Sequence, residues 1–90
     1  MGKGARYNLK KLEEIIKSLG YKVIYEKGNF KSGYCVVEQS HVIVVNRFLA
    51  PEGRIGLLLE IVEKSGFPLS ELETNDLKYL QKLRMRFIRD

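Results

Sequence analysis

The sequence predicts a small α+β domain of the order αβββαα, in which a three-stranded, mainly antiparallel sheet is covered by helices. Three observations lead to this class: an amphipathic repeat near the start, three strand-like runs in the middle, and two helical segments after Pro51. Ninety residues, 44% hydrophobic and 30% charged, suffice for one domain with a modest core. We therefore expect a single domain, 1–90, with a flexible start (1–7), a core (8–65) and a C-terminal basic helix (70–89).

The first helix is predicted over residues 8–19. Asn8 is a suitable N-cap, because its side-chain oxygen can accept a hydrogen bond from a backbone N–H one turn later. Gly20 can adopt the left-handed conformation that ends a helix. The apolar side chains between these two residues fall on one helical face: Leu9, Leu12, Ile15, Ile16 and Leu19. This pattern is typical of a helix that packs one side against a core.

Three strands are predicted in the middle of the chain. Residues 21–26 alternate between apolar and polar side chains, which is the period of a half-buried strand. The runs 34–38 and 42–46 are expected to form a hairpin around residues 39–41. The unbroken apolar stretch 42–45 favours a central strand that is covered on both faces.

The helix that opens at Pro51 is apolar around more than half of its circumference. Its apolar residues are Ile55, Leu57, Leu58, Leu59, Ile61 and Val62. Such a helix is expected to lie between the sheet and a second cover, which is either the last helix or another copy of the chain. The last helix is predicted from about residue 75 to residue 88, after start signals at Ser70 and Thr74.

Four features occur together within residues 8–65: Leu19-Gly20-Tyr21 after the first helix, a strand led by Gly33, the strand end Ile43-Val44-Val45-Asn46, and Arg54 before an apolar helix. In this combination the chain resembles the catalytic core of the ImmA/IrrE-type zinc metallopeptidases. The resemblance implies a zincin-like scaffold whose helix carries His-Glu-x-x-His, with two zinc-binding histidines and a glutamate that acts on the metal-bound water. The motif falls on Leu59-Glu60-Ile61-Val62-Glu63.

The chain departs from that family at both zinc-binding positions. Residues four apart share a helix face and can hold one ion, but Leu59 has no lone pair and Glu63 replaces an imidazole. Glu60 matches the family's glutamate, yet without a metal it has no water to activate. We therefore expect a degenerate motif, no cofactor and no enzymatic activity. The alternative is a metal-dependent hydrolase that combines Glu63 with Glu73 or Asp76, an all-oxygen set suited to Mg²⁺ or Ca²⁺.

The single cysteine, Cys35, excludes an internal disulfide and a cysteine-based metal cluster. Together with His41, which is predicted in the hairpin turn, it could form a nucleophile and a base, but no third residue is evident to orient the imidazole. The sequence contains no apolar run of about 18 residues, as a membrane span requires, and no apolar segment of a secretory signal near its start. We expect a cytoplasmic protein without membrane contact.

Basic residues form a stripe along the predicted C-terminal helix. At about 100° per residue, its four members lie within an arc of roughly 80°. They are Lys78, Lys82, Arg86 and Arg89. Such a stripe can neutralise phosphates or contact an acidic partner. The simpler interpretation is a solvated surface, because positive charge near a helix C-terminus complements the macrodipole.

Arg84 differs from the stripe because it projects into the apolar arc of the last helix. There it can extend its charge to water, pair with Glu60 or Glu63, or mark an interface together with Leu57 and Ile61. The favoured hypothesis is a non-catalytic module, on a metallopeptidase-like scaffold, that binds another protein or itself through the apolar helix. The alternative is a nucleic-acid-binding accessory protein that uses the basic stripe.

Overall fold

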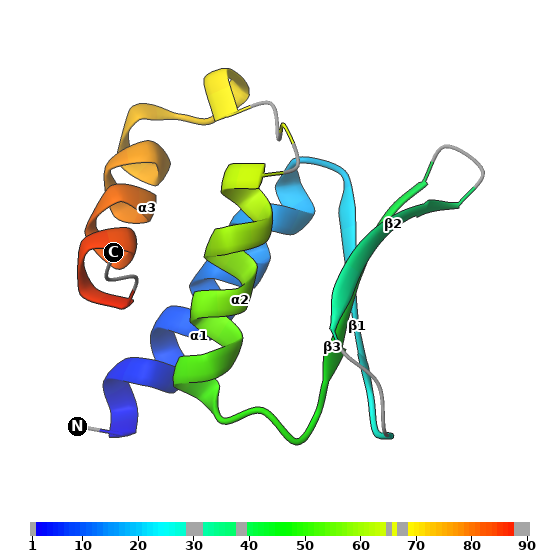
Figure 1. Cartoon of the computed structure of the whole chain (residues 1–90). Coiled ribbons are helices and arrows are strands. Elements are labelled where there is room, and N and C mark those ends of the chain that lie inside the picture. The colour runs from blue at the N-terminus through cyan, green and yellow to red at the C-terminus, as the bar shows by residue number, and fades with distance from the viewer. Residues whose placement is uncertain (1, 29–31, 38–39, 65, 67–68, 88–90) are drawn as a thin grey trace.

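The computed structural model describes residues 2–28, 32–37, 40–64, 66 and 69–87 (Figure 1). Its elements are α1 (Gly2–Ser18), β1 (Tyr21–Glu26), β2 (Gly33–Val37), β3 (Ser40–Asn46), α2 (Pro51–Lys64), the short 3₁₀ helix η1 (Leu69–Glu71) and α3 (Thr74–Phe87). The α+β class is confirmed. Within the described part of the chain, no helix has the length and apolar character needed to cross a membrane.

The sheet is mixed, so the prediction of a mainly antiparallel sheet is wrong. The strand order is β1-β3-β2. β1 runs parallel to β3, from the pair Tyr21↔His41 to the pair Glu26↔Asn46, and only β2 pairs with β3 in the antiparallel sense. β3 carries the longest apolar run and lies between the other two strands, because a central strand loses the most contact with water.

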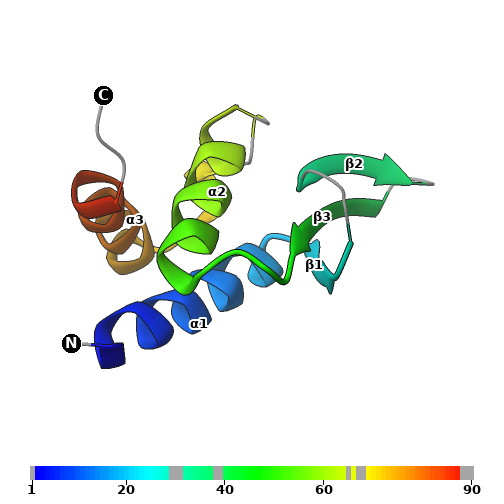
Figure 2. The same ribbon diagram turned by 60° about the horizontal axis from the view of Figure 1, so that its bottom comes forward.

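The three helices lie on one side of the sheet (Figures 1 and 2). α1 and α2 form the layer next to the sheet, and α3 packs against α2 and α1 on the far side of that layer. On β3 the side chains of Ile43 and Val45 face this layer and are fully buried. No described helix covers the opposite face, where Val44 is half-buried and Ile24 of β1 is 38% exposed. The central position of β3 is confirmed, and its opposite face is partly covered, since Val42 there is 9% exposed while Val44 is half-buried.

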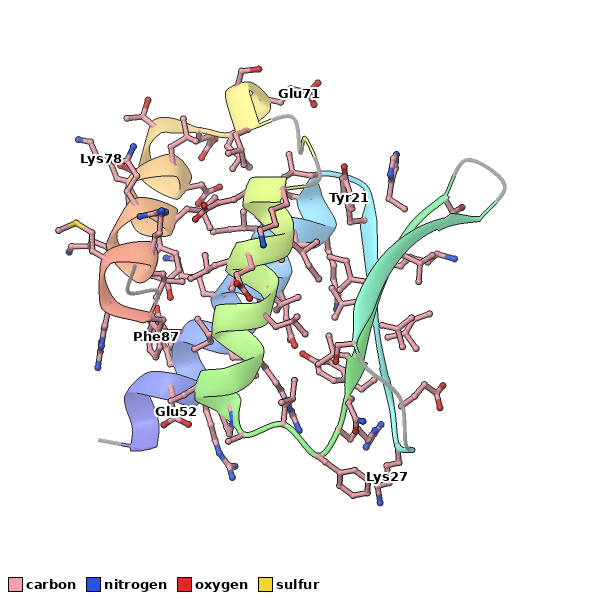
Figure 3. The ribbon with its side chains drawn as sticks, in the orientation of Figure 1. Tyr21, Lys27, Glu52, Glu71, Lys78 and Phe87 are labelled. Carbon is pink, nitrogen blue, oxygen red and sulfur yellow. The ribbon has the colours of Figure 1, made fainter. Side chains whose placement is uncertain are left out.

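Apolar side chains from α1, α2 and the inner face of the sheet form one core, with Tyr21 at one end of the layer between helices and sheet (Figure 3). The largest fully buried side chains are Leu12, Ile16, Ile43, Ile55, Leu58 and Val45. On α2 the buried residues are Ile55, Leu58, Leu59, Ile61 and Val62. Of the two covers predicted for this helix, the structure therefore contains the last helix of the same chain.

α1 begins at Gly2, six residues before the predicted helix start at residue 8, so that predicted start is wrong. Asn8 lies inside the helix and is only 9% exposed. Its Oδ1 accepts a hydrogen bond from the Tyr79 hydroxyl at 2.5 Å, so its partner is α3 rather than its own backbone. Ala5 is also buried and extends the apolar face by one turn beyond Leu9. A buried asparagine is tolerated here because another helix satisfies it.

The helix ends follow the sequence signals more closely. Gly20 has a φ of 91° and directly follows the last turn of α1, and Gly66, with a φ of 68°, follows α2. α3 begins at Thr74, and the Leu77 N–H donates to the Glu73 carbonyl at 3.0 Å. The predicted start near residue 75 is therefore correct within one residue. The segment from Leu69 forms η1 as a separate turn.

Candidate functional site

The side chains of the degenerate motif, Leu59, Glu60 and Glu63, point in different directions. Leu59 is 3% exposed and belongs to the core, whereas Glu60 and Glu63 are exposed. Successive residues of a helix are rotated by about 100°, so the step from Leu59 to Glu60 turns the side chain toward solvent. Among the described residues, no three His, Cys, Asp or Glu side chains are grouped so that they could hold a metal ion. Glu63, Glu73 and Asp76 are therefore not brought together as a metal site.

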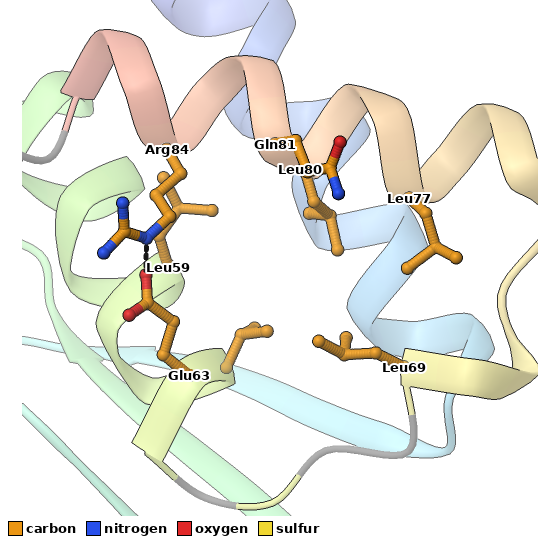
Figure 4. A pocket seen from close by; sticks show the side chains of 8 residues that line it. Leu59, Glu63, Leu69, Leu77, Leu80, Gln81 and Arg84 are labelled. Atoms are coloured by element: carbon orange, nitrogen blue, oxygen red, sulfur yellow. Dashed lines mark hydrogen bonds and ion pairs between the residues drawn. The ribbon is translucent and has the colours of Figure 1, made fainter.

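An apolar pocket of about 130 Å³ lies beside Glu63, between α2, η1 and α3 (Figure 4). It is lined by Leu59, Val62, Glu63, Leu69, Leu77, Leu80, Gln81 and Arg84. At its rim the Arg84 Nε donates to the Glu63 Oε2 at 2.5 Å, which is one of the three arrangements expected for Arg84. Both side chains are exposed to water, so the pair is worth at most about 1 kcal/mol.

The predicted interface on α2 is mostly used inside the molecule. Ile61 is 9% exposed, and Leu57 is half-buried and packs against the core. Arg84 is engaged with Glu63. Little apolar surface of α2 is therefore left for a partner.

The basic stripe is joined by a residue from another helix. Lys78 and Lys82 line a groove of about 440 Å³ together with Lys11 of α1, whose Nζ lies 4.9 Å from the centre of the Tyr79 ring. The Arg86 guanidinium lies 5.4 Å from the centre of the Phe87 ring, and Arg89 is outside the described residues. Lys11 could not be assigned to this stripe from the sequence, because no short sequence pattern shows that α1 packs beside α3.

His41 lies in β3, so its predicted place in a hairpin turn is wrong. β3 begins at Ser40, which pairs with Val37 of β2, and the His41 and Tyr21 rings are 4.5 Å apart between centroids. In the β2–β3 register, His41 pairs with Val36, and Cys35 pairs with the following residue of β3. Cys35 and His41 are therefore not a cross-strand pair.

β1 forms one edge of the sheet and β2 the other, and β1 pairs on one side only. The Arg47 N–H donates to the Glu26 carbonyl at 2.8 Å and continues the β1–β3 ladder. Because backbone groups of an edge strand point alternately toward its neighbour and away from it, the N–H and C=O groups of Val23 and Tyr25 point to the open side. There the Arg47 Nε donates a long hydrogen bond of 3.5 Å to the Tyr25 carbonyl. This edge can accept a further strand.

The side chains of β1 that turn away from the helices form a short pattern of their own. Ile24 is one of the exposed large hydrophobic residues, and Lys22 and Glu26 on either side of it are exposed as well. In the sheet, Ile24 lies next to Val44 of β3, which is half-buried. The open face therefore carries an apolar centre between a positive and a negative charge.

Two polar residues hold the connection between β3 and α2. Asn46 donates from Nδ2 to the Gly28 carbonyl at 2.8 Å, and its Oδ1 accepts from the Phe48 N–H at 3.0 Å. Arg54 donates from Nε to the Leu49 carbonyl at 2.9 Å and from Nη2 to the Arg47 carbonyl at 2.8 Å. Both residues belong to the features that carry the metallopeptidase resemblance, and here they order the loop that precedes α2.

A larger cavity of about 600 Å³ opens beside this loop, between α1, the end of β1 and the start of α2. Its lining residues are Arg6, Leu9, Lys10, Glu13, Tyr25, Pro51 and Arg54. Burial raises the pKa of the Glu13 carboxyl, and the nearby Lys17 and Arg54 partly oppose that rise. No sequence motif indicates this site, because its residues come from three separate elements.

Comparison with known proteins adds no assignment. No protein-family model matches the chain, and no similar curated protein or solved structure is found. The resemblance to ImmA/IrrE-type metallopeptidases therefore stays a prediction, and the function has to be argued from the geometry.

Proposed function

We propose that this protein is a non-catalytic self-association module that forms a twofold dimer by pairing β1 with β1 of a second copy. The observation that carries the proposal is the order of exposed side chains on an unpaired edge strand: Lys22, Ile24 and Glu26. An edge strand with free backbone groups is a ready template for another strand. The charges along β1 are complementary to the same charges read in the opposite direction, so an antiparallel copy places lysine opposite glutamate.

The charge pattern selects one arrangement of the two copies. When two β1 strands run antiparallel about an axis at Ile24, Lys22 of each copy lies opposite Glu26 of the other. A parallel arrangement in register would instead place lysine against lysine and glutamate against glutamate, which is destabilising. The same antiparallel register places Ile24 against Ile24 in the non-hydrogen-bonded position, where facing side chains are closest. The paired edge would thus gain two ion pairs and an apolar contact.

The backbone supports the same register. Val23 and Tyr25 have their N–H and C=O groups on the open side of β1, and an axis at Ile24 pairs Val23 with Tyr25 of the other copy, whose carbonyl would exchange its long hydrogen bond from the Arg47 Nε for one from the Val23 N–H. These residues then occupy the hydrogen-bonded positions that alternate with the Ile24 pair. Beside Ile24, Val44 extends the apolar contact into the neighbouring strand of each copy. The product would be a continuous six-stranded sheet with the helices of both copies on one side.

Charge-reversal variants test this dimer by sedimentation velocity over a concentration series. The wild-type chain is expected to reach twice its 10.4 kDa mass. Lys22→Glu and Glu26→Lys should each weaken the dimer at least about tenfold, because two cross-strand pairs worth roughly 0.2–1 kcal/mol each become repulsive. The double variant Lys22→Glu with Glu26→Lys restores both pairs and should recover dimerisation. Lys17→Glu, an exposed reversal on α1, is the matched control.

Mixing the two single variants gives the sharpest result. The chain with Lys22→Glu carries two acidic residues on the edge, and the chain with Glu26→Lys carries two basic ones. Each should therefore stay monomeric alone and form a heterodimer with the other. A wild-type chain that remains monomeric at millimolar concentration, or a dimer that ignores these reversals, would rule out this interface.

The groove formed by Lys11, Lys78 and Lys82 favours a second candidate function, the binding of nucleic-acid phosphates. A double variant, Lys78→Glu with Lys82→Glu, should then lower affinity for DNA and RNA by at least about tenfold. The binding should also weaken steeply between low and physiological salt, because phosphate contacts release counterions. Fluorescence-anisotropy titrations at two salt concentrations measure both effects. Affinity that is independent of salt would exclude this function.

A cytoplasmic location is part of the same proposal. It is supported by the single cysteine of the chain, since proteins of oxidising compartments that are this small commonly rely on disulfides.

A further inference from the structure

We infer that the cavity between α1, β1 and α2 binds a small organic anion, one carboxylate or phosphate group on an apolar body. The cavity lies on the helix side of the sheet and shares only Tyr25 with the proposed dimer edge, through its side chain rather than its backbone. At about 600 Å³ its size is that of small-molecule sites in proteins. Its lining combines apolar Leu9 and Pro51 with charged side chains.

The charges favour an anion. Three basic side chains line the cavity, Arg6 and Lys10 from α1 and Arg54 from α2, against the single carboxyl of Glu13. The first turn of α2 also borders the cavity at Pro51, and a helix N-terminus has a partial positive charge. The N-terminus of α2 and the basic side chains therefore both favour the binding of an anion.

Arg54 is held in place before any ligand arrives. Two backbone carbonyls, of Arg47 and Leu49, fix its Nη2 and Nε, and its guanidinium carbon lies 5.0 Å from the centre of the Tyr25 ring. Neither of these hydrogen bonds uses the Nη1 amine. An arginine that is already ordered loses little conformational freedom when it binds an anion, and its planar group suits carboxylate and phosphate oxygens.

Tyr25 gives an independent reason to expect a ligand. Its ring lines the cavity, and its hydroxyl is buried without a hydrogen-bond partner among the described residues. Buried hydroxyl groups nearly always have a partner, because an unpaired one loses its bond to water without replacement. Less than 1 Å² of this hydroxyl is accessible to a water-sized probe, so an anion oxygen accepts its hydrogen bond only once the side chains around it move apart. The stacked Arg54 would then bind the same anionic group.

Binding can be measured on the full chain by two-dimensional ¹H–¹⁵N NMR, with phenyl phosphate and benzoate as the two anionic probes and benzyl alcohol as the neutral one. Saturable shifts are expected around Arg6, Lys10, Tyr25 and Arg54 with one or both anions, and benzyl alcohol should cause none of comparable size. The stronger of the two anions then distinguishes a phosphate site from a carboxylate site.

Variants of the lining complete the test. Arg6→Glu with Lys10→Glu should weaken binding of the stronger anion at least about tenfold, since both residues are on the surface side of α1 and reverse the charge at the opening. Tyr25→Phe should weaken it at least about threefold through the lost hydroxyl. Lys64→Glu reverses an exposed charge at the opposite end of α2, outside the cavity, and should leave affinity unchanged. Affinity that is unchanged in either lining variant, equal loss in the control, or the absence of saturable shifts would overturn the inference.

Discussion

Replacing Leu59 by histidine, which restores the first zinc-binding position of the resembled motif, is expected to destabilise the protein by about 2–4 kcal/mol. Leu59 is 3% exposed and packs in the core beside Leu80. The substitution removes apolar contacts and places an imidazole where it must give up its bonds to water. Urea denaturation followed by circular dichroism measures the loss as a lower midpoint with an unchanged slope.

The pH dependence of Leu59→His provides its internal check. A buried imidazole has a lowered pKa in the folded state, whereas in the unfolded chain it titrates near 6.5. The unfolded state therefore binds more protons below that pH, and the deficit should grow as the pH falls from 7 to 5. Leu59→Met, which keeps the volume and the apolar character, should cost less than about 1.5 kcal/mol. A histidine variant as stable as the wild type would mean that position 59 opens to solvent.

Truncating Asn46 to alanine should cost about 1–3 kcal/mol, the second largest effect that we expect. The change removes the Nδ2 donor to the Gly28 carbonyl and the Oδ1 acceptor of the Phe48 N–H. Each net hydrogen bond contributes about 1 kcal/mol, and a partner left unsatisfied adds to the loss. The backbone N–H of residue 46 keeps its bond to the Ser32 Oγ, so the loop is weakened rather than released. Denaturant titration again gives the magnitude.

Asn75→Ala is the matched control for Asn46→Ala. Asn75 is exposed in the first turn of α3, so the same atoms are deleted where water can replace them. Its effect should stay within about 0.5 kcal/mol. Equal effects at the two positions would contradict the role of Asn46 in holding the connection between β3 and α2.

Local patterns predicted most elements of the fold, because helix and strand periods are properties of short segments. Pro51 and Thr74 mark the helix starts within one residue, and Gly20 follows the end of α1. The pairing of β1 was not predictable in the same way. Its alternating side chains fit a parallel neighbour as well as an antiparallel one, and the choice depends on where the chain returns to the sheet. Asn8 was misread for a related reason, since its partner Tyr79 comes from the other end of the chain.

The site was less predictable than the fold. The contact of Arg84 with Glu63 could be expected, because each lies at the border of an apolar helix face. The cavity beside Arg54 could not, because a motif search reads neighbours in sequence, whereas its walls combine distant segments of α1, β1 and α2. The exposed pattern around Ile24 was visible in the sequence, but it became informative only once β1 was found at the edge.

The strand order β1-β3-β2 also implies an order in which the strand pairs form during folding. Tyr21 pairs with His41, twenty positions later, whereas Val37 pairs with Ser40, three positions away. Short loops close at a lower entropy cost than long ones, so the hairpin of β2 and β3 can form first and β1 must wait for it. During synthesis β1 leaves the ribosome before β3 is complete, and until then both of its edges are unpaired. In that interval Lys22 and Glu26 disfavour parallel in-register pairing with a neighbouring chain, which would place like charges opposite each other.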